Sequence, residues 1–306
     1  MRILVAGGTG RLGTRLVRRL VLEGHRVRVL TRHPERHAAA AHGVDLVRGD
    51  LTATVDPVVC DGIDVVFSCA SASARLLDAD DDTTFENVNH YGNVSLLRAA
   101  LRAGVQKFVY LAPLGAERLA HTAYGGAHER FVQTLQRSTL PHVVVRPTAG
   151  FDYIREALLL LRAGHPWLFG ESAQATNPIQ EDDLAGFCVG ALHADQVEVA
   201  VGGPRSFTRF EIARIARTAL ADAPPRYGVP ARLDRPVLRR TNRRVRDLLE
   251  FGTAICGLDV IGPAHGTRDL ERELRAFAGH APPAPAVGEH SRPAGPPLLA
   301  LDVQLI

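Results

Sequence analysis

The chain has 306 residues, 46% of them hydrophobic, which is enough for one large α/β domain or for a large and a small lobe. The 36 basic and 33 acidic residues leave a net charge of +3, so overall charge does not indicate nucleic acid or an anionic membrane as a partner. The four widely spaced cysteines predict neither a metal knuckle nor a disulfide framework and favour a reducing compartment. The opening MRILVAGGTG is too short and too soon broken for a signal peptide, and no apolar run reaches the roughly 18–20 residues of a membrane span, so we expect a cytoplasmic protein.

Strand and helix patterns alternate along the first half of the chain. Strands are predicted at 2–6, 26–31, 44–48, 63–68, 107–112 and 141–146, with helices from residue 14, at 88–103 and at 127–138. Because right-handed crossovers join such units, they predict an α/β fold with a doubly wound parallel sheet. After Pro147 the pattern loosens, with helices predicted at 154–163, 181–193 and 208–222 and a strand at 197–201.

A glycine loop, GGTGRLG from Gly7 to Gly13, lies between the first strand and the first helix. Positions without a Cβ allow a tight turn and let the backbone approach a pyrophosphate, while the N–H groups that open the helix face the anion. In this context the loop predicts a Rossmann-type dinucleotide-binding domain.

The second strand ends at Arg32, where a carboxylate would accept from an adenosine 2′-hydroxyl. An arginine at this place pairs instead with a 2′-phosphate, and His33 and Arg36 are close by. The sequence therefore predicts NADP(H) as the cofactor. Asp50, after the third strand, either holds the adenine amino group or caps a helix.

Several segments, in order, carry a family resemblance: AGGTGRLG, TRHPER, GDL, NVNHYGNVSLLRAALRAGVQKFVYLA, LPHVVVRPTAGF and NPIQEDDLA. Together they resemble the atypical short-chain dehydrogenase/reductases, specifically the NmrA-like NAD(P)-binding branch. The cofactor-binding residues that this resemblance implies are Gly7, Thr9, Gly10, Arg11, Leu12 and Gly13 at the pyrophosphate, Arg32 at the 2′-phosphate, Asp50 and Leu51 at the adenine, Ser68, Cys69 and Ala70 under the riboses, and Pro147 and Thr148 beside the nicotinamide.

The resemblance also implies a division of the chain into 1–150, the NADP(H)-binding domain, and 151–280, a small C-terminal cap over the substrate with strand 197–201 returning to the sheet. Residues 281–306 are a Pro-rich linker and an apolar tail. A homodimer formed through this tail or through the helix at 88–103 stays an open alternative. The predicted pocket for a small-molecule substrate consists of Ser71, Pro113, Leu114, Phe151, Tyr153 and Trp167.

The chain departs from the family's catalytic set, which is a serine after the fifth strand and a Tyr-x-x-x-Lys pair. Ala112 or Pro113 takes the serine position, Tyr124 the tyrosine position and His128 the lysine position. Lys107, the only lysine, opens the fifth strand and cannot substitute. We therefore take Tyr124 as the candidate proton donor and His128 as its helper, with Ala112 and His128 also beside the cofactor.

Three interpretations of this degenerate set stay open. His128 does the work of the lysine; or hydride transfer needs little acid catalysis, as with a quinone, enone or imine; or the site is inactive and the protein senses NADP(H) as a regulator. The leading function is an NADPH-dependent reductase of a small conjugated or aromatic substrate (a ketone, quinone, enone or imine), with a nicotinamide-retaining isomerase or dehydratase as a further alternative.

Two charged runs are interpreted as solvated surface. Residues 232–246 carry seven arginines but no interleaved aromatic residues, so no nucleic-acid partner is predicted. The aspartates at 80–82 lack nearby ligands at metal-binding spacing, so no metal site is predicted.

Overall fold

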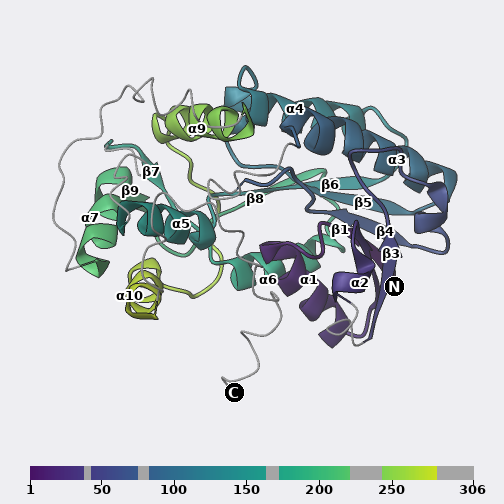
Figure 1. The fold of residues 1–306 in the computed structure, drawn as a ribbon, viewed down its shortest axis with the longest axis horizontal. Helices are drawn as coiled ribbons and strands as arrows, with labels where there is room; N and C mark the ends of the chain where they lie inside the picture. The colour runs from purple at the N-terminus through teal and green to yellow at the C-terminus, as the bar shows by residue number, and fades with distance from the viewer. Residues whose placement is uncertain (38–42, 75–82, 163–171, 221–242, 281–306) are drawn as a thin grey trace.

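Seven parallel strands form one sheet in the computed structural model, which describes residues 1–37, 43–74, 83–162, 172–220 and 243–280. Their order is β3-β2-β1-β4-β5-β6-β8 (Figure 1). The strands are β1 (Arg2–Ala6), β2 (Arg26–Thr31), β3 (Val44–Arg48), β4 (Val65–Ser68), β5 (Lys107–Leu111), β6 (His142–Pro147) and β8 (Glu198–Val201). The order reverses between β1 and β4, and ligands of doubly wound sheets bind outside the strand ends at such a point.

The alternation of side chains along each strand explains why helices cover both faces. In β1, Ile3 and Val5 belong to the core cluster that includes Leu16 and Leu184. These two leucines lie in α1 (Arg11–Leu22) and α6 (Glu181–Ala191), which lie side by side on one face (Figure 1).

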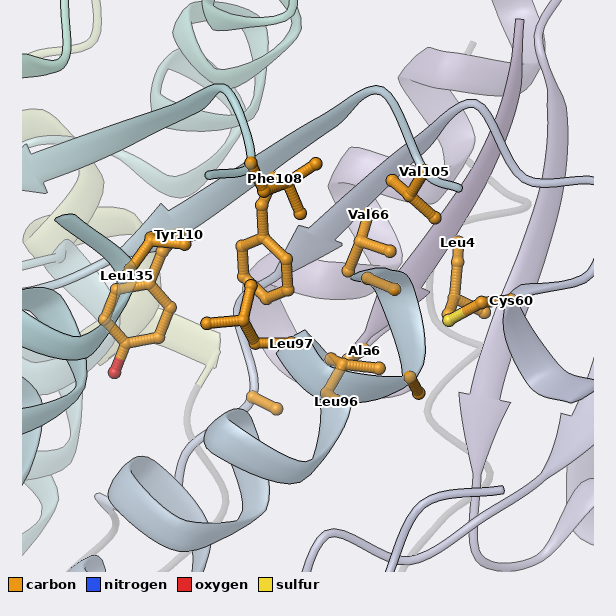
Figure 2. Packing of buried hydrophobic residues seen from close by; sticks show 14 of the residues in the cluster. Leu4, Ala6, Cys60, Val66, Leu96, Leu97, Val105, Phe108, Tyr110 and Leu135 are labelled. Atoms are coloured by element: carbon orange, nitrogen blue, oxygen red, sulfur yellow. The ribbon is translucent and has the colours of Figure 1, made fainter. Parts of the chain in front are cut away.

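The opposite face of the sheet is covered by α3 (Asn93–Arg102) and α4 (Ala123–Gln136). Figure 2 shows this cluster, in which Leu97 and Leu135 lie beside Phe108 and Tyr110 of β5. All four side chains are almost completely buried, so the sheet is fixed by apolar packing on both sides.

The predicted fold class is confirmed, and the strand predicted at 197–201 pairs in parallel with β6. Two helix predictions need correction. The helix predicted at 88–103 starts as a π-helical turn, Glu86–Gly92, and continues as α3. The helix predicted from residue 127 begins at Ala123, because the Thr122 hydroxyl caps it by accepting from the Gly125 amide at 3.2 Å.

Beyond β6, and apart from α6, the described residues include four helices and a two-stranded ribbon, which we call the cap. They are α5 (Phe151–Arg162), α7 (Arg209–Ala219), α9 (Arg243–Cys256), α10 (Leu270–His280), and the antiparallel pair β7 (Ala175–Thr176) and β9 (Phe207–Thr208). One apolar cluster, which includes Phe151, Leu158 and Ile212, joins these elements. The cap lies beyond the β6–β8 edge of the sheet (Figure 1), while α6 and β8 return to the sheet itself. The domain boundary at residue 150 stays a prediction.

Several predictions fall outside the described residues: the aspartates at 80–82, Trp167, most of the arginine-rich run, and the segment 281–306. The last four residues of that run, 243–246, open α9. Within the described ranges, no helix combines the length and the apolar character needed to cross a membrane.

Candidate cofactor and active site

The glycine loop ends on a helix that has no side-chain cap. Gly10 is the N-cap of α1 and supplies no side chain, whereas Thr122, Gln180 and Thr208 cap α4, α6 and α7. The first N–H groups of α1 therefore lack a side-chain acceptor and are suited to an anion.

Two glycines of the loop have a structural reason, one in its backbone conformation and the other in close packing. Gly7 has φ +79°, in the left-handed region. A Cβ at Gly13 would lie 2.0 Å from the Gly7 carbonyl oxygen, so the helix packs directly on the loop.

A pocket of about 270 Å³ opens at the carboxyl ends of β1, β2 and β4. Eight of the predicted cofactor residues line it: Gly7, Thr9, Gly10, Arg32, Asp50, Leu51, Cys69 and Ala70. Ser71, predicted for the substrate, also lines it. His33, which the sequence places close to Arg32, lines it too, and sequence reasoning missed the remaining lining residues, Leu30, Thr31, Gly49, Thr52, Ala72, Thr83 and Val88. Most of these residues are close in sequence to predicted residues at the ends of β2, β3 and β4. That closeness was the signal that would have identified them.

Arg32 and Asp50 follow β2 and β3, at the place where proteins of this fold distinguish between dinucleotide cofactors. Arg32 is exposed, and its guanidinium takes part in no ion pair or hydrogen bond that the structure describes, although its carbonyl accepts from Arg48 at 2.9 Å. One oxygen of Asp50 accepts from the Thr52 amide at 2.8 Å. The other oxygen is left for a donor such as an amino group.

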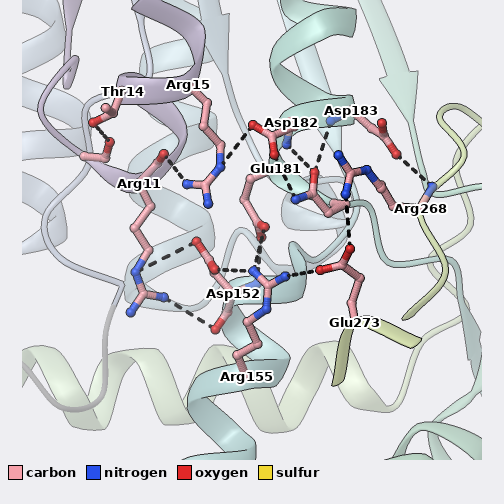
Figure 3. A network of polar contacts seen from close by, with 12 residues as sticks. Arg11, Thr14, Arg15, Asp152, Arg155, Glu181, Asp182, Asp183, Arg268 and Glu273 are labelled. Atoms are coloured by element: carbon pink, nitrogen blue, oxygen red, sulfur yellow. Dashed lines mark hydrogen bonds and ion pairs between the residues drawn. The ribbon is translucent and has the colours of Figure 1, made fainter. Parts of the chain in front are cut away.

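The other predicted cofactor residues do not line this pocket. Ser68 is fully buried and its hydroxyl bonds to Asn93 at 2.5 Å, while the Thr148 hydroxyl donates to the Asn177 carbonyl at 2.6 Å. The Arg11 guanidinium lies 3.9 Å from the Asp152 carboxylate at the start of α5 (Figure 3). The side chain predicted for the pyrophosphate thus ties the glycine loop to the cap. Leu12, Gly13, Ala112, His128 and Pro147 lie outside the pocket as well.

Tyr124 lies in an aromatic box on the first turn of α4. Its ring makes edge contacts with Phe85, His128 and Phe251, with centroids 4.7, 4.8 and 4.7 Å away. It also packs with Ala72, Val88 and Leu51, which line the cofactor pocket. No hydrogen bond to its hydroxyl is found among the described residues. Burial raises the pKa of Tyr124 to about 12, so the phenol is protonated at neutral pH.

His128, one turn further along α4, is held at both ring nitrogens. Nδ1 lies 2.7 Å from the Tyr110 hydroxyl and Nε2 lies 2.8 Å from the Asn89 carboxamide nitrogen. Burial, with a further contribution from the Arg146 charge, lowers the pKa of His128 from 6.5 to about 3. In this arrangement the imidazole is neutral and neither nitrogen faces a ligand.

Asn89 joins this network to the cofactor pocket. Its Oδ1 accepts from the Ala72 amide at 2.9 Å, and its Nδ2 lies 2.9 Å from the Ser71 hydroxyl. Sequence reasoning missed Asn89, although it stands in the quoted NVNHYG segment, and also missed Phe85. Phe251 could not be found because α9 was not predicted.

The predicted substrate residues are spread between two places. Pro113 and Leu114 are half-buried beside β6, where the Leu114 amide donates to the Pro147 carbonyl at 2.8 Å. Phe151 is in the core of the cap, and Tyr153 lies between α5 and α9. Among the described residues no cluster of histidine, cysteine or acidic side chains fits a metal ion.

Comparison with known proteins gives a family. The model of the NAD(P)H-binding family matches residues 7–195, well over half of the chain. The chain belongs to this NAD(P)H-binding family. The short-chain dehydrogenase/reductase resemblance is thereby confirmed.

Two curated proteins illustrate the relatives of this NAD(P)H-binding protein. It is 29% identical over 224 residues to the photosystem II assembly factor Ycf39 of Synechocystis sp., a match that covers 70% of this chain and 66% of that protein. It is 39% identical over 115 residues to a 3 beta-hydroxysteroid dehydrogenase/Delta 5-->4-isomerase of Mycobacterium tuberculosis, covering 36% of this chain and 30% of that protein. The matches therefore span about two thirds or less of these relatives.

Solved structures share the fold at low identity. A nucleoside-diphosphate-sugar epimerase from Staphylococcus aureus superposes with a TM-score of 0.68 at 16% identity, covering 90% of this chain and 96% of that one. The UDP-glucose 4-epimerase of Thermus thermophilus, solved with NAD, gives a TM-score of 0.61 at 18% identity, covering 92% and 98%.

Proposed function

We propose that this protein is an NADPH-dependent reductase of a small conjugated or aromatic organic substrate, acting in the cytoplasm. The observation that carries the proposal is Tyr124, a protonated phenol with no hydrogen-bond partner among the described residues, packed against residues that line the cofactor pocket. The free state of all four cysteines fits a reducing compartment.

The residues present fit an NADP(H) cofactor. The uncapped N-terminus of α1 suits the pyrophosphate, Arg32 the 2′-phosphate and Asp50 the adenine amino group. When bound, the cofactor supplies a hydride. Cys69 and Ala70 line one side of the pocket and would contact a nucleotide bound there.

Tyr124 donates a hydrogen bond, and finally its proton, to the atom of the substrate that gains negative charge. Its high pKa makes it a weak acid, since no lysine is nearby to lower it. Substrates that stabilise the developing charge by conjugation need the least acid help. This is why a quinone or an enone fits the site better than an unactivated ketone.

His128 is proposed as a positioning residue. Because its imidazole is neutral and bonded at both nitrogens, it orients the Tyr124 ring through their edge contact rather than holding a ribose. Ala112 adds no hydroxyl at the serine position and is 1% exposed. Because Ala112 supplies no hydroxyl, the role of proton donor is assigned to Tyr124.

The test is steady-state NADPH oxidation with a quinone and a cyclic enone. Tyr124→Phe should lower kcat for the enone by about 10²-fold, the lower range for a single general acid, and lower it less for the quinone. Tyr91→Phe, at a 59% exposed tyrosine, is the matched control and should leave kcat unchanged. Equal rates for Tyr124→Phe and the parent protein would overturn the role of Tyr124.

Two alternatives have specific support. The similarity to a photosystem II assembly factor and the absent serine and lysine favour a non-catalytic NADP(H)-sensing regulator. The similarity to a dehydrogenase/isomerase favours an enzyme that retains its nicotinamide. The regulator predicts no turnover and a marked preference for one redox form, whereas the isomerase predicts substrate conversion without net NADPH oxidation.

A further inference from the structure

One side chain at the end of the glycine loop is held by the cap. The Arg11 guanidinium donates to the Asp152 carbonyl at 3.4 Å, and its Nε lies 3.9 Å from the Asp152 carboxylate (Figure 3). Arg11 is the first residue of α1 and directly follows Thr9 and Gly10, which line the cofactor pocket. Asp152 lies in the first turn of α5. The contact therefore joins the start of the cofactor-binding helix to the start of the cap.

Asp152 is fixed in the cap by other contacts. Its carboxylate pairs with Arg155 at 2.8 Å, and its amide donates to the buried Glu181 carboxylate at 2.6 Å. Arg155 is held in turn by Glu273 of α10 at 2.9 Å (Figure 3). The Asp152 carboxylate therefore keeps an arginine partner when Arg11 leaves it, and the cap is not left with an unpaired carboxylate.

Arg11 is the loosely held member of this network. Its side chain is 34% exposed, compared with 15% for Arg155, and its contacts are the longer ones. A partly exposed ion pair of this kind changes an equilibrium constant by about fivefold or less. The Arg11 carbonyl accepts from the Arg15 guanidinium at 2.9 Å, so its main chain is fixed and the movement needed is one of the side chain.

A dinucleotide offers Arg11 a better acceptor than Asp152 does. A pyrophosphate carries more negative charge than a carboxylate, and one guanidinium can donate two parallel hydrogen bonds to it. Asp152, in contrast, already shares its carboxylate with Arg155. The N–H groups that open α1 draw the anion to the same place, because Gly10 leaves them without a side-chain acceptor.

We propose that Asp152 and the pyrophosphate of a bound dinucleotide compete for Arg11, so that cofactor binding releases the cap from the glycine loop. Because coupling between two sites is reciprocal, the Arg11–Asp152 contact weakens dinucleotide binding by the same factor by which the dinucleotide weakens the contact. The inference rests on the cofactor part of the proposed function and needs no turnover.

Calorimetric titration of the full chain with NADH and NADPH tests the competition in a double-mutant cycle. Arg11→Gln should weaken the binding of both dinucleotides by about threefold or more, since both contain the pyrophosphate. Asp152→Asn should tighten the binding of both by about two- to fivefold, because Arg11 is then unopposed. It should have no such effect when Arg11→Gln is already present.

Asp182→Asn is the matched control. Asp182 pairs with Arg15 of the same helix at 3.3 Å, but it lies in α6 and not in the cap. Its loss removes one carboxylate beside α1 and should leave dinucleotide affinity unchanged. An equal tightening by Asp182→Asn would overturn the competition, because the removal of any negative charge would then suffice.

Hydrogen exchange of the parent protein provides a measurement that needs no variant of Asp152. The amides of Phe151, Asp152 and Tyr153 are all hydrogen-bonded, so their exchange requires the first turn of α5 to open. NADH should speed this exchange by about two- to fivefold in the parent protein and should not speed it in Arg11→Gln. Unchanged or slower exchange in the parent protein would contradict the release of the cap.

The outcomes of the titration separate this inference from the reductase. Unchanged affinity in Arg11→Gln, no tightening by Asp152→Asn, or an equal tightening with and without Arg11 would overturn the competition. Because NADH lacks the 2′-phosphate and no substrate is present, neither a failed reductase assay nor an affinity that is independent of Arg32 affects this result. No binding of either dinucleotide would overturn both proposals.

Discussion

The carboxamide nitrogen of Asn89 lies 2.8 Å from Nε2 of His128, and this contact sets the tautomer of the histidine. The Ala72 amide can only donate, so Asn89 must present Oδ1 to it and Nδ2 to the imidazole. Nε2 is then the acceptor and Nδ1 carries the proton toward the Tyr110 hydroxyl. The histidine at the family's lysine position is therefore a neutral part of a buried network.

The neutral state of His128 predicts a loss of stability in acid. Its folded pKa of about 3 is below the unfolded value of 6.5, so the unfolded chain binds more protons between these two pH values. Its contribution is complete above pH 6.5 and falls as the pH drops, by about 2 kcal/mol at pH 5. Urea unfolding at pH 7.5 and pH 5 measures the change, and His128→Phe should reduce it.

The same titration can be followed directly by NMR. The His128 ring proton should show no titration between pH 5 and pH 8. A His128 midpoint near 6.5 would contradict the network.

Because Gly13 packs closely on Gly7, one methyl group added at Gly13 should strongly affect stability and nucleotide binding. Gly13→Ala places a Cβ 2.0 Å from the Gly7 carbonyl oxygen, so the glycine loop must shift. We expect a destabilisation of about 1–3 kcal/mol and loss of nucleotide binding in calorimetry. Gly190→Ala in α6 is the matched control, because nothing lies within 4 Å of its Cβ; it should stabilise the fold by about 0.5–1 kcal/mol.

Arg146 of β6 and Glu129 of α4 form a buried ion pair, and the Arg146 Nε also donates to the Glu198 carboxylate at 2.7 Å. The two guanidinium nitrogens lie 2.6 and 3.1 Å from the carboxylate oxygens, and both residues are buried. Glu129→Gln should cost about 1–3 kcal/mol, less than the loss for an unpaired buried charge, because Glu198 still pairs with Arg146. Urea unfolding provides the measurement.

A double replacement, Arg146→Met with Glu129→Met, should recover most of that loss, since no charge then remains buried. Arg205→Met removes an exposed pair with Asp269 and should change stability by less than about 1 kcal/mol. A loss for Glu129→Gln as small as that for Arg205→Met would refute the buried pair.

Local patterns predicted the seven strands of the sheet and eight of the residues that line the pocket, but not β7 and β9. Alternation in RVRVLT and the glycines of GGTGRLG depend on neighbours in sequence, and β2 and the pocket at Gly7 and Arg32 follow from them. The start of α4 was missed because two glycines in its first turn mask the helical pattern, while the Thr122 cap fixes it.

Long-range contacts account for what the sequence could not show. His128 is engaged by Asn89 and Tyr110, which come from two other elements, so its buried state is not visible in the spacing Tyr124-x-x-x-His128. The closure of the aromatic box by Phe251 depends on how α9 docks against α4. The ion pair that turns Arg11 toward Asp152 likewise joins residues far apart in the chain.

Calorimetric titration of the full chain with NADPH, NADP+, NADH and NAD+, repeated with Arg32→Ala, measures whether the pocket binds NADP(H) through Arg32. Arg36→Ala is the matched control, because this arginine is exposed and does not line the pocket. We expect tight binding of the phosphorylated forms and no change with Arg36→Ala. Arg32→Ala should weaken their binding about tenfold or more, in keeping with a charge-assisted contact of about 1.5–3 kcal/mol. Equal affinities for NADPH and NADH, or unchanged NADPH affinity in Arg32→Ala, would contradict it.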